Sequence, residues 1–243
     1  MRNLYLSTLA IEVTRRCNMC CAHCLRGDAQ AVDISDETLE KFLSRVSSIG
    51  TIVFTGGEPS IAVDRIQKIL KICERNGISV SGFYIVTNGK TVTREFLWSM
   101  ICWYNYVLES GGDPDMCALA LSRDNFHSPI LQMNETMLRA LAFFCEDKFT
   151  DFRKVPLLRL GRARETNTYQ TNVPRRYHPE IDIIDENEIS VESNVLLSAT
   201  GYILPECDYE YAETEAIALG HVDDMDGFVR TLEKMVEGDE IGA

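Results

Sequence analysis

The chain has 243 residues, enough for one large domain or two small ones around a sizeable core. Its formal net charge is −13, and this acidity disfavours a nucleic acid as the partner because like charges repel. The composition, 45% hydrophobic and 25% charged, is that of a folded protein, which excludes an intrinsically disordered chain. Four arginines that lie close together in sequence could still form a local basic patch: Arg162, Arg164, Arg175 and Arg176.

The sequence predicts a cytoplasmic protein that makes no membrane contact. No apolar run reaches the roughly 18 residues that a membrane-spanning helix needs. The N-terminal stretch soon meets Glu12, Arg15 and Arg16, which predicts a first strand and not a signal peptide. Nine cysteines without a secretion signal indicate reduced thiols, metal ligands and buried residues, not a disulfide framework.

The first half of the chain alternates between predicted strands and predicted helices. Strands are expected at residues 4–13, 51–54 and 78–86, and helices at residues 36–50, 66–77 and 93–104. Ser35 or Asp36 can cap the first helix, and Gly50 is expected to end it. Cys73 falls on the apolar stripe of the second helix and is interpreted as a small core residue.

The second half begins with the same alternation and then changes. The expected elements are a short extended segment at 106–108, a strand at 116–121, a helix at 137–145 and a strand at 155–160. Residues 165–188 contain Pro174 and Pro179 and no helical stripe, so they predict a long loop. A β-hairpin at 189–204 and a helix around residues 228–235 are expected to follow.

Strands alternating with helices predict an α/β fold built from parallel βαβ units. In such a fold the residues just after the strands gather at one edge of the sheet or barrel. Residues 1–165 are predicted to form the core. Residues 166–243 are predicted to form a loop, a β-hairpin and a C-terminal helix that complete or cap it.

Three cysteines with C-x3-C-x2-C spacing follow the first predicted strand: Cys17, Cys21 and Cys24. Three thiolates suit a soft metal or an iron–sulfur cluster, and leave one iron of a four-iron cluster without a protein ligand. Cys20 permits a second register, from Cys17 through Cys20 to Cys24. A zinc site is the main alternative; His23 could be a ligand, but zinc would need a further cysteine or histidine cluster.

Cys-Asn-Met-Cys-Cys-Ala-His-Cys at 17–24, Thr-Gly-Gly-Glu-Pro at 55–59 and Thr-Asn-Gly at 87–89 together resemble the radical S-adenosylmethionine (radical SAM) superfamily over residues 8–160. The resemblance implies a partial (β/α)6 TIM-type barrel. It implies one [4Fe–4S] cluster on Cys17, Cys21 and Cys24, with S-adenosylmethionine on the fourth iron. It also implies reductive cleavage to a 5′-deoxyadenosyl radical that abstracts a substrate hydrogen.

The resemblance also implies which residues contact S-adenosylmethionine. Two glycines let the backbone approach the methionine amino group, and a carboxylate suits an ammonium partner. Pro59 would stiffen that turn, and His23 would lie against the adenine. The implied contacts are His23, Gly56, Gly57, Glu58, Pro59, Asn88, Ser122 and Asp124. His127 is interpreted as a hydrogen-bonded structural residue.

The C-terminal part resembles the start of a SPASM extension, a cysteine-rich segment that binds auxiliary clusters. The likeness lies in a hairpin that leads to Pro205-Glu206-Cys207 and then to Leu219-Gly220-His221. One thiol cannot hold an auxiliary cluster, so one cluster per chain is expected. Cys207 is either a buried remnant or a donor that returns a hydrogen atom to a substrate radical. Gly161-Arg162-Ala163 resembles another motif of the superfamily, although Arg162 and Arg164 favour a solvated role.

Three functions are thus open. The favoured one is a radical SAM enzyme that acts on a peptide or a small molecule, with an electron donor such as flavodoxin or ferredoxin. The second is an activase that installs a glycyl radical on a partner protein. The third is a non-enzymatic iron–sulfur or zinc module. The acidic charge favours a basic peptide over tRNA as the substrate.

Overall fold

The computed structural model describes residues 2–127, 131–146, 150–172 and 179–240. Pro174, Arg175 and Arg176, which entered the predictions above, lie outside these ranges. In the described part of the chain, no helix is both long enough and apolar enough to cross a bilayer.

Five parallel strands joined by four helices form the first part of the fold. The elements are β1 (Asn3–Thr14), α1 (Asp36–Leu43), β2 (Val46–Gly56), α2 (Val63–Asn76), β3 (Ser79–Thr87), α3 (Arg94–Glu109), β4 (Cys117–Leu121), α4 (Gln132–Arg139) and β5 (Phe144–Cys145). The five strands lie side by side in chain order, and each neighbouring pair is parallel. This order confirms the predicted α/β fold with a partial barrel.

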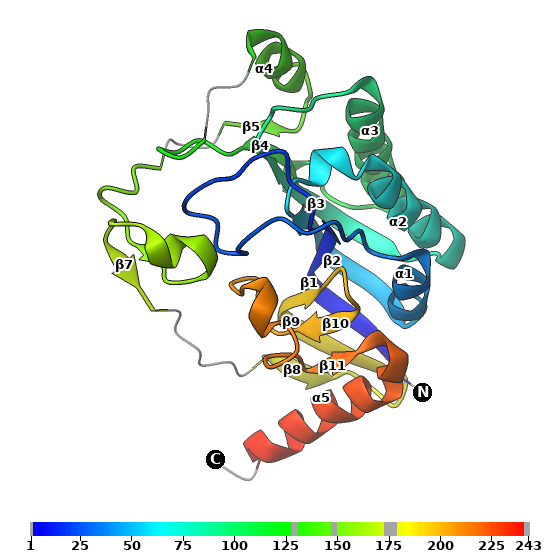
Figure 1. Cartoon of the computed structure of the whole chain (residues 1–243). Helices are drawn as coiled ribbons and strands as arrows, with labels where there is room; N and C mark the ends of the chain where they lie inside the picture. Colours follow the sequence, from blue (N-terminus) through cyan, green and yellow to red (C-terminus); the bar gives the residue numbers. More distant parts are fainter. Residues whose placement is uncertain (1, 128–130, 147–149, 173–178, 241–243) are drawn as a thin grey trace.

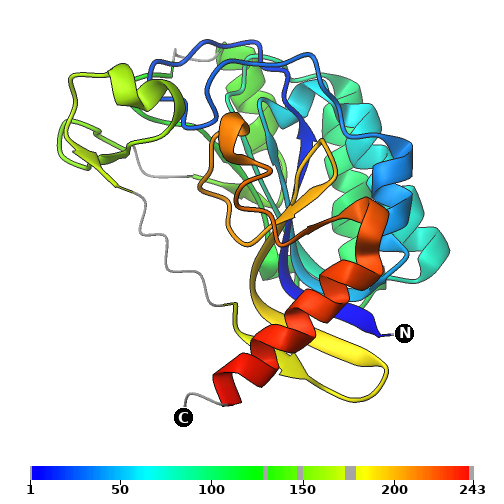
Figure 2. The same cartoon turned by 60° about the horizontal axis from the view of Figure 1, so that its bottom comes forward.

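The C-terminal strands extend the same sheet from its other edge. They are β8 (Ile181–Ile183), β9 (Glu188–Leu197), β10 (Tyr202–Leu204) and β11 (Gly220–His221). β9 is parallel to β1, whereas β8 and β10 are antiparallel to β9. The helix α5 (Met225–Glu240) lies across this end of the sheet, as Figure 2 shows. Both predicted regions therefore share one sheet, and the boundary at residue 165 stays a prediction.

The two faces of the sheet carry different partners because side chains alternate along each strand. Figure 1 shows α1, α2 and α3 along one side of the sheet. Leu9, Ile52 and Phe83 belong to the large hydrophobic core on the helix side. The opposite face, called the inner face below, carries a smaller apolar cluster of Ala10, Leu196, Leu204, Tyr209 and Tyr211. The inner face is where the cysteine loop lies.

Several predicted elements have other bounds. α1 ends at Leu43 and not at Gly50, and β2 begins at Val46, because residues 46–56 pair with β1 along its length. The segment 106–108 is the end of α3 and not an extended stretch. α4 ends at Arg139, and Phe144 and Cys145 form the fifth strand of the main sheet, with Cys145 exposed.

The segment 155–160 does not join the main sheet as predicted. Only Leu157–Leu158 is extended, as β6, and it pairs with β7 (Gln170–Thr171) in a separate two-stranded sheet. The predicted loop over 165–188 therefore contains β7 and β8 within its described residues. The prediction for Cys73 is confirmed, since its side chain is fully buried in α2.

Candidate functional site

The cysteine loop connects β1 to α1 and crosses the inner face of the sheet (Figure 1). The last part of the loop, residues 30–34, is called its returning arm below. Backbone hydrogen bonds from Arg15 N to Val32 O (2.7 Å) and from Ile34 N to Val13 O (3.2 Å) join this arm to the end of β1. The Thr14 hydroxyl also donates to the Asp33 carboxylate at 2.5 Å. Both ends of the loop are thus held by β1.

A cavity of about 360 Å³ lies between this loop and the carboxyl ends of the strands. Most of the predicted site residues line it: Cys17, Cys21, His23, Cys24, Gly56, Gly57, Glu58, Pro59, Asn88 and Ser122. Asp124 and Cys207 are not among the described residues that line it. Loops that are far apart in sequence therefore meet at one place, as expected for parallel strands.

The wall of the cavity includes strand residues that were not predicted as site residues. Val53 and Thr55 of β2, and Tyr84 and Val86 of β3, face the cavity. They alternate with residues that face the helices, such as Phe83. The period-two alternation of the strands was the signal that could have identified them. Arg26 also lines the cavity and was missed.

The Gly56-Gly57 turn lies directly against the entry of the cysteine loop. Gly57 N donates to Thr14 O at 2.8 Å, and Glu58 N donates to Arg16 O at 2.9 Å. A Cβ atom on Gly57 would lie 2.1 Å from Arg16 O, which is a backbone atom. Only glycine permits this approach, so the two segments form a continuous backbone surface next to the cysteines.

The Glu58 side chain is 2% exposed, and its carboxylate is held by three donors. One oxygen accepts hydrogen bonds from Ser60 N (3.1 Å) and from the Thr87 hydroxyl (2.7 Å). The other oxygen accepts a hydrogen bond from Asn88 N at 2.9 Å. A carboxylate has about four acceptor positions, so roughly one is left for a ligand.

Asn88 connects the β3 turn to the cysteine loop. Its side-chain amide donates to the side-chain oxygen of Asn18 at 2.8 Å, and the Asn18 amide donates to the Thr91 hydroxyl at 2.9 Å. Asn18 follows Cys17 directly, so these bonds orient the loop at its first cysteine. Asn88 was expected at the rim of the site, but Asn18 was not identified as its partner.

A compact group of His23, Asp124, Phe126 and His127 borders the cysteines. The His23 ring stacks on Phe126, with centroids 4.5 Å apart. His127 Nδ1 lies 2.7 Å from Asp124 Oδ2, which also lies 3.5 Å from His23 Nε2. Asp124 further accepts hydrogen bonds from the backbone N–H groups of Phe126 and His127. Asp124 therefore contacts both histidines, and it is not among the described residues that line the cavity.

Both histidine pKa values are shifted. Burial lowers the pKa of His23, although the negative charge of Asp124 opposes this shift. Burial also works against protonation of His127, but hydrogen bonds to Asp124 and Cys21 outweigh it and raise the pKa of His127 to about 9. For the Cys17 thiol, burial is the main cause of a raised pKa. A metal that binds there must displace the proton.

Cys20 lies apart from the other three cysteines of the loop. It is exposed and is not among the described residues that line the cavity. Its sulfur accepts a hydrogen bond from the Arg162 guanidinium, and Arg162 N donates to Cys24 O at 3.0 Å. A Cβ atom on Gly161 would lie 2.5 Å from Gly27 N, so this motif packs closely against the cysteine loop. Arg162 therefore contacts the cysteine loop, whereas the sequence favoured a solvated role for it.

Cys207 packs at the edge of the inner apolar cluster, next to Tyr209. Burial raises the pKa of its thiol, while the positive charge of Arg26 opposes the shift. This burial agrees with the interpretation of Cys207 as a structural thiol. The role of hydrogen-atom donor stays a prediction.

Comparison with known sequences identifies one family. Residues 11–101 match the sequence profile of the radical SAM superfamily. Among curated proteins, the uncharacterized protein MJ0907 of Methanocaldococcus jannaschii is 28% identical over 90 residues. That match covers 36% of this chain and 32% of the relative, so the chain spans about a third of the relative's length.

Comparison with solved structures shows a likeness of fold. Hexahistidine-tagged anSMEcpe with bound AdoMet (S-adenosylmethionine) has a TM-score of 0.50 at 13% identity, over 92% of this chain and 80% of that one. Native anSMEcpe with bound AdoMet and the Cp18Cys peptide has a TM-score of 0.42 at 18% identity, over 58% of this chain and 42% of that one. SuiB of Streptococcus suis, bound to its precursor peptide SuiA, has a TM-score of 0.38 at 13% identity, over 83% and 60% of the two chains.

Proposed function

This chain belongs to the radical SAM superfamily, and on that premise we propose that it uses one [4Fe–4S] cluster and S-adenosylmethionine to remove a hydrogen atom from a peptide or a small molecule. The observation that carries the proposal is the convergence of three cysteines and the Gly-Gly-Glu turn on one cavity. Because the chain spans only part of its first relatives, the substrate and the partners are proposals throughout.

The donor set fits a four-iron cluster with one open iron. Cys17, Cys21 and Cys24 line the same cavity, whereas Cys20 is held on the outside by Arg162. We therefore assign the first three as cluster ligands. Soft thiolates suit iron in such a cluster, and three of them leave one iron for another ligand.

A bound cluster would pass one electron, received from an external donor, to S-adenosylmethionine, which would give methionine and a 5′-deoxyadenosyl radical. The chain's residues would bind and orient these groups and exclude water. The Gly56-Gly57 backbone and the remaining acceptor position of Glu58 suit the methionine ammonium group. Asn88 and Ser122 present polar groups on the same rim of the cavity. Pro59 starts the short 3-10 turn that holds Glu58 in place.

His23 is proposed to contact the adenine, since its ring is already held flat against Phe126. Asp124 is proposed to act through His23 and His127, because its carboxylate is occupied by His127. The inner wall of Tyr84 and Val86 would then face the substrate. An external electron donor such as flavodoxin or ferredoxin is needed, since the reaction consumes an electron from outside the chain.

A zinc site is the second candidate, because one observation favours it. The ligand atoms of His23, Asp124 and His127 all lie within 4.8 Å of one another, next to Cys21. No histidine cluster that could complete a zinc site was expected from the sequence, and the tertiary structure brings one together. A zinc ion held by histidines, a carboxylate and a thiolate would give a metal module without the radical chemistry.

A matched pair of cysteine variants tests the assignment. After anaerobic reconstitution, the wild-type chain and Cys20→Ser are expected to hold about four irons and to release 5′-deoxyadenosine from S-adenosylmethionine under strong reductant. Cys21→Ser is expected to lose both properties, because Cys21 lines the cavity and Cys20 does not. Iron analysis and product chromatography measure the two outcomes.

Other results would contradict the proposal. Equal loss of iron in Cys20→Ser and Cys21→Ser would refute the assigned register. One zinc ion and no iron in the wild-type chain, together with zinc loss in His127→Asn, would establish the zinc module instead.

A further inference from the structure

A buried ion pair lies on the inner face of β1, just before the first cysteine. Arg15 Nε is 2.9 Å from Glu12 Oε2, and the two residues are 5% and 0% exposed. A buried charge pair is costly to desolvate and persists only when further hydrogen bonds satisfy its remaining groups. The partners that satisfy this pair come from distant parts of the chain.

Besides Arg15, Glu12 has two hydrogen-bond partners among the described residues, and both belong to residues 199–214, called the C-terminal segment below. Ala199 N donates to Glu12 Oε2 at 2.9 Å, and the Tyr209 hydroxyl donates to Glu12 Oε1 at 2.7 Å. Ala199 lies in the turn between β9 and β10, and Tyr209 lies in the inner apolar cluster. Glu12 therefore joins β1 to the C-terminal hairpin.

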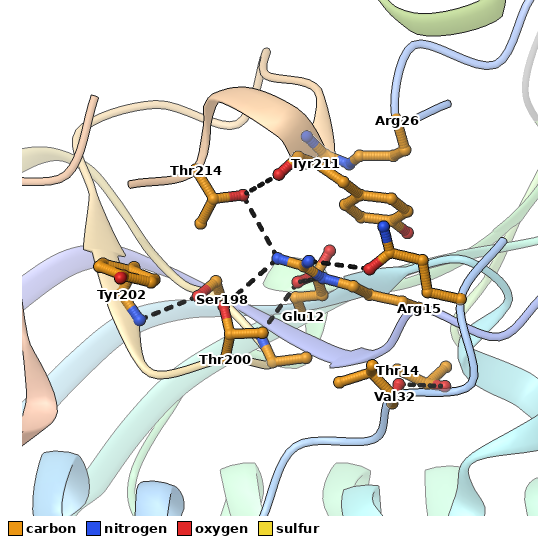
Figure 3. Close-up of polar contacts among 12 residues, drawn as sticks. Glu12, Thr14, Arg15, Arg26, Val32, Ser198, Thr200, Tyr202, Tyr211 and Thr214 are labelled. Atoms are coloured by element: carbon orange, nitrogen blue, oxygen red, sulfur yellow. Dashed lines mark hydrogen bonds and ion pairs between the residues drawn. The ribbon is translucent and has the colours of Figure 1, made fainter. Parts of the chain in front are cut away.

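The side chain of Arg15 contacts the same C-terminal segment, as Figure 3 shows. One terminal nitrogen donates to the Thr200 and Thr214 hydroxyls at 3.4 and 3.3 Å, and the other donates to the Gln30 side chain at 3.0 Å. The guanidinium also lies over the Tyr211 ring, 4.4 Å from its centroid. Arg15 thus links the C-terminal segment to the returning arm of the cysteine loop.

The backbone of Arg15 is bonded to that arm as well. Arg15 N donates to Val32 O at 2.7 Å, and Gln30 N donates to Arg15 O at 3.0 Å. Arg15 and Tyr211 also line a small cavity of about 40 Å³ together with the three cysteines Cys17, Cys21 and Cys24. One residue therefore contacts the entry of the cysteine loop, its exit and the C-terminal segment.

We propose that Arg15, oriented by Glu12, is a positioning residue through which residues 199–214 hold the cysteine loop in its metal-binding conformation. The C-terminal segment is then part of the scaffold of the site, although none of its described residues lines the larger cavity. The bonding pattern requires a planar group with several fixed donors, which arginine has and lysine lacks. The inference rests on the proposed function only for the identity of the metal group.

Hydrogen exchange of the metal-free protein tests the positioning without any cofactor. The variants are Arg15→Lys, which keeps the charge, and Thr214→Val, which removes the hydroxyl that accepts from Arg15 and donates to Tyr211 O at 3.0 Å. Arg75→Gln is the matched control, since Arg75 pairs with Glu40 on the helix side and contacts neither the cysteine loop nor the C-terminal segment. In Arg15→Lys, exchange in residues 17–33 and in residues 199–214 is expected to rise together by about tenfold, the effect of losing one or two net hydrogen bonds.

A smaller change in Thr214→Val is expected in the same two segments. Exchange in β3 of both variants, and exchange of the two segments in Arg75→Gln, are expected to stay at the wild-type level. After reconstitution, Arg15→Lys is expected to show a broadened electron paramagnetic resonance signal from the reduced cluster. Wild-type exchange of both segments in Arg15→Lys, or a rise spread evenly over the chain, would overturn the inference. A wild-type chain that binds no iron would refute the proposed function and would leave the exchange result to decide on Arg15.

Discussion

Gly57→Ala is expected to destabilise the protein by about 3 kcal/mol and to abolish iron incorporation. The new Cβ would lie 2.1 Å from Arg16 O and 2.7 Å from Arg16 C, so the backbone itself would have to move. The movement would break the bonds from Gly57 N to Thr14 O and from Glu58 N to Arg16 O. Each lost bond costs about 1 kcal/mol, and strain in the displaced segment adds a similar amount.

The effect on the metal follows from the position of the strained segment. Residues 14–16 lead directly into Cys17, so displacing them moves the first proposed ligand. Gly77→Ala is the matched control: Gly77 ends α2 at a positive φ of 65°, but a Cβ there meets no atom within 4 Å. The control is expected to lose about 1 kcal/mol and to keep its iron.

Urea denaturation and iron analysis of the two variants provide the measurement. If Gly57→Ala unfolds at the same urea concentration as Gly77→Ala and binds about four irons, the close contact between the two segments is not required.

Glu58→Gln is expected to lower affinity for S-adenosylmethionine at least roughly tenfold and to destabilise the chain by about 1–3 kcal/mol. The substitution turns one acceptor oxygen into a donor NH₂ group. In one orientation this group faces Asn88 N, and in the other it faces Ser60 N and the Thr87 hydroxyl. Either way, a buried backbone N–H, of Asn88 or of Ser60, faces another donor and loses its acceptor.

The loss of affinity has a second cause. The amide removes the negative charge that we propose as the partner of the methionine ammonium group. Glu146→Gln is the matched control, because Glu146 is an exposed carboxylate paired with Arg139 on the surface. Isothermal titration with S-adenosylmethionine and thermal denaturation separate the two effects. Unchanged affinity in Glu58→Gln would remove Glu58 from the proposed ligand contacts and leave its structural role intact.

The sequence predicted most accurately where local pattern and tertiary packing agree. The helix α2 has an apolar stripe and ends at Gly77, and both features appear as expected. The first helix was predicted too long because residues 46–50, which also fit the end of a helix, pair instead with β1. Residues 155–160 were apolar enough for a strand of the main sheet, but only two of them are extended, and they pair with β7.

The features of the site also fall into those that local sequence patterns predict and those that they do not. The cysteine spacing and the Gly-Gly-Glu turn are local patterns, and their positions after β1 and β2 were sufficient to predict that they meet. The sequence also limited the thiols available to the C-terminal segment to one, Cys207. These features require only the chain order and the geometry of parallel strands.

Only the tertiary structure decided which residues hold the cysteine loop in place. Glu12 meets Ala199 and Tyr209 across 187 and 197 positions of the chain, and no periodicity predicts such a pair. The same holds for Arg162 with Cys20, which separates that thiol from the other three. Local patterns report which face a residue occupies, whereas the partner on that face depends on where β9 joins the sheet. The edge of β1 accepts β9 in this fold, and that one pairing brings the C-terminal segment to the cysteines.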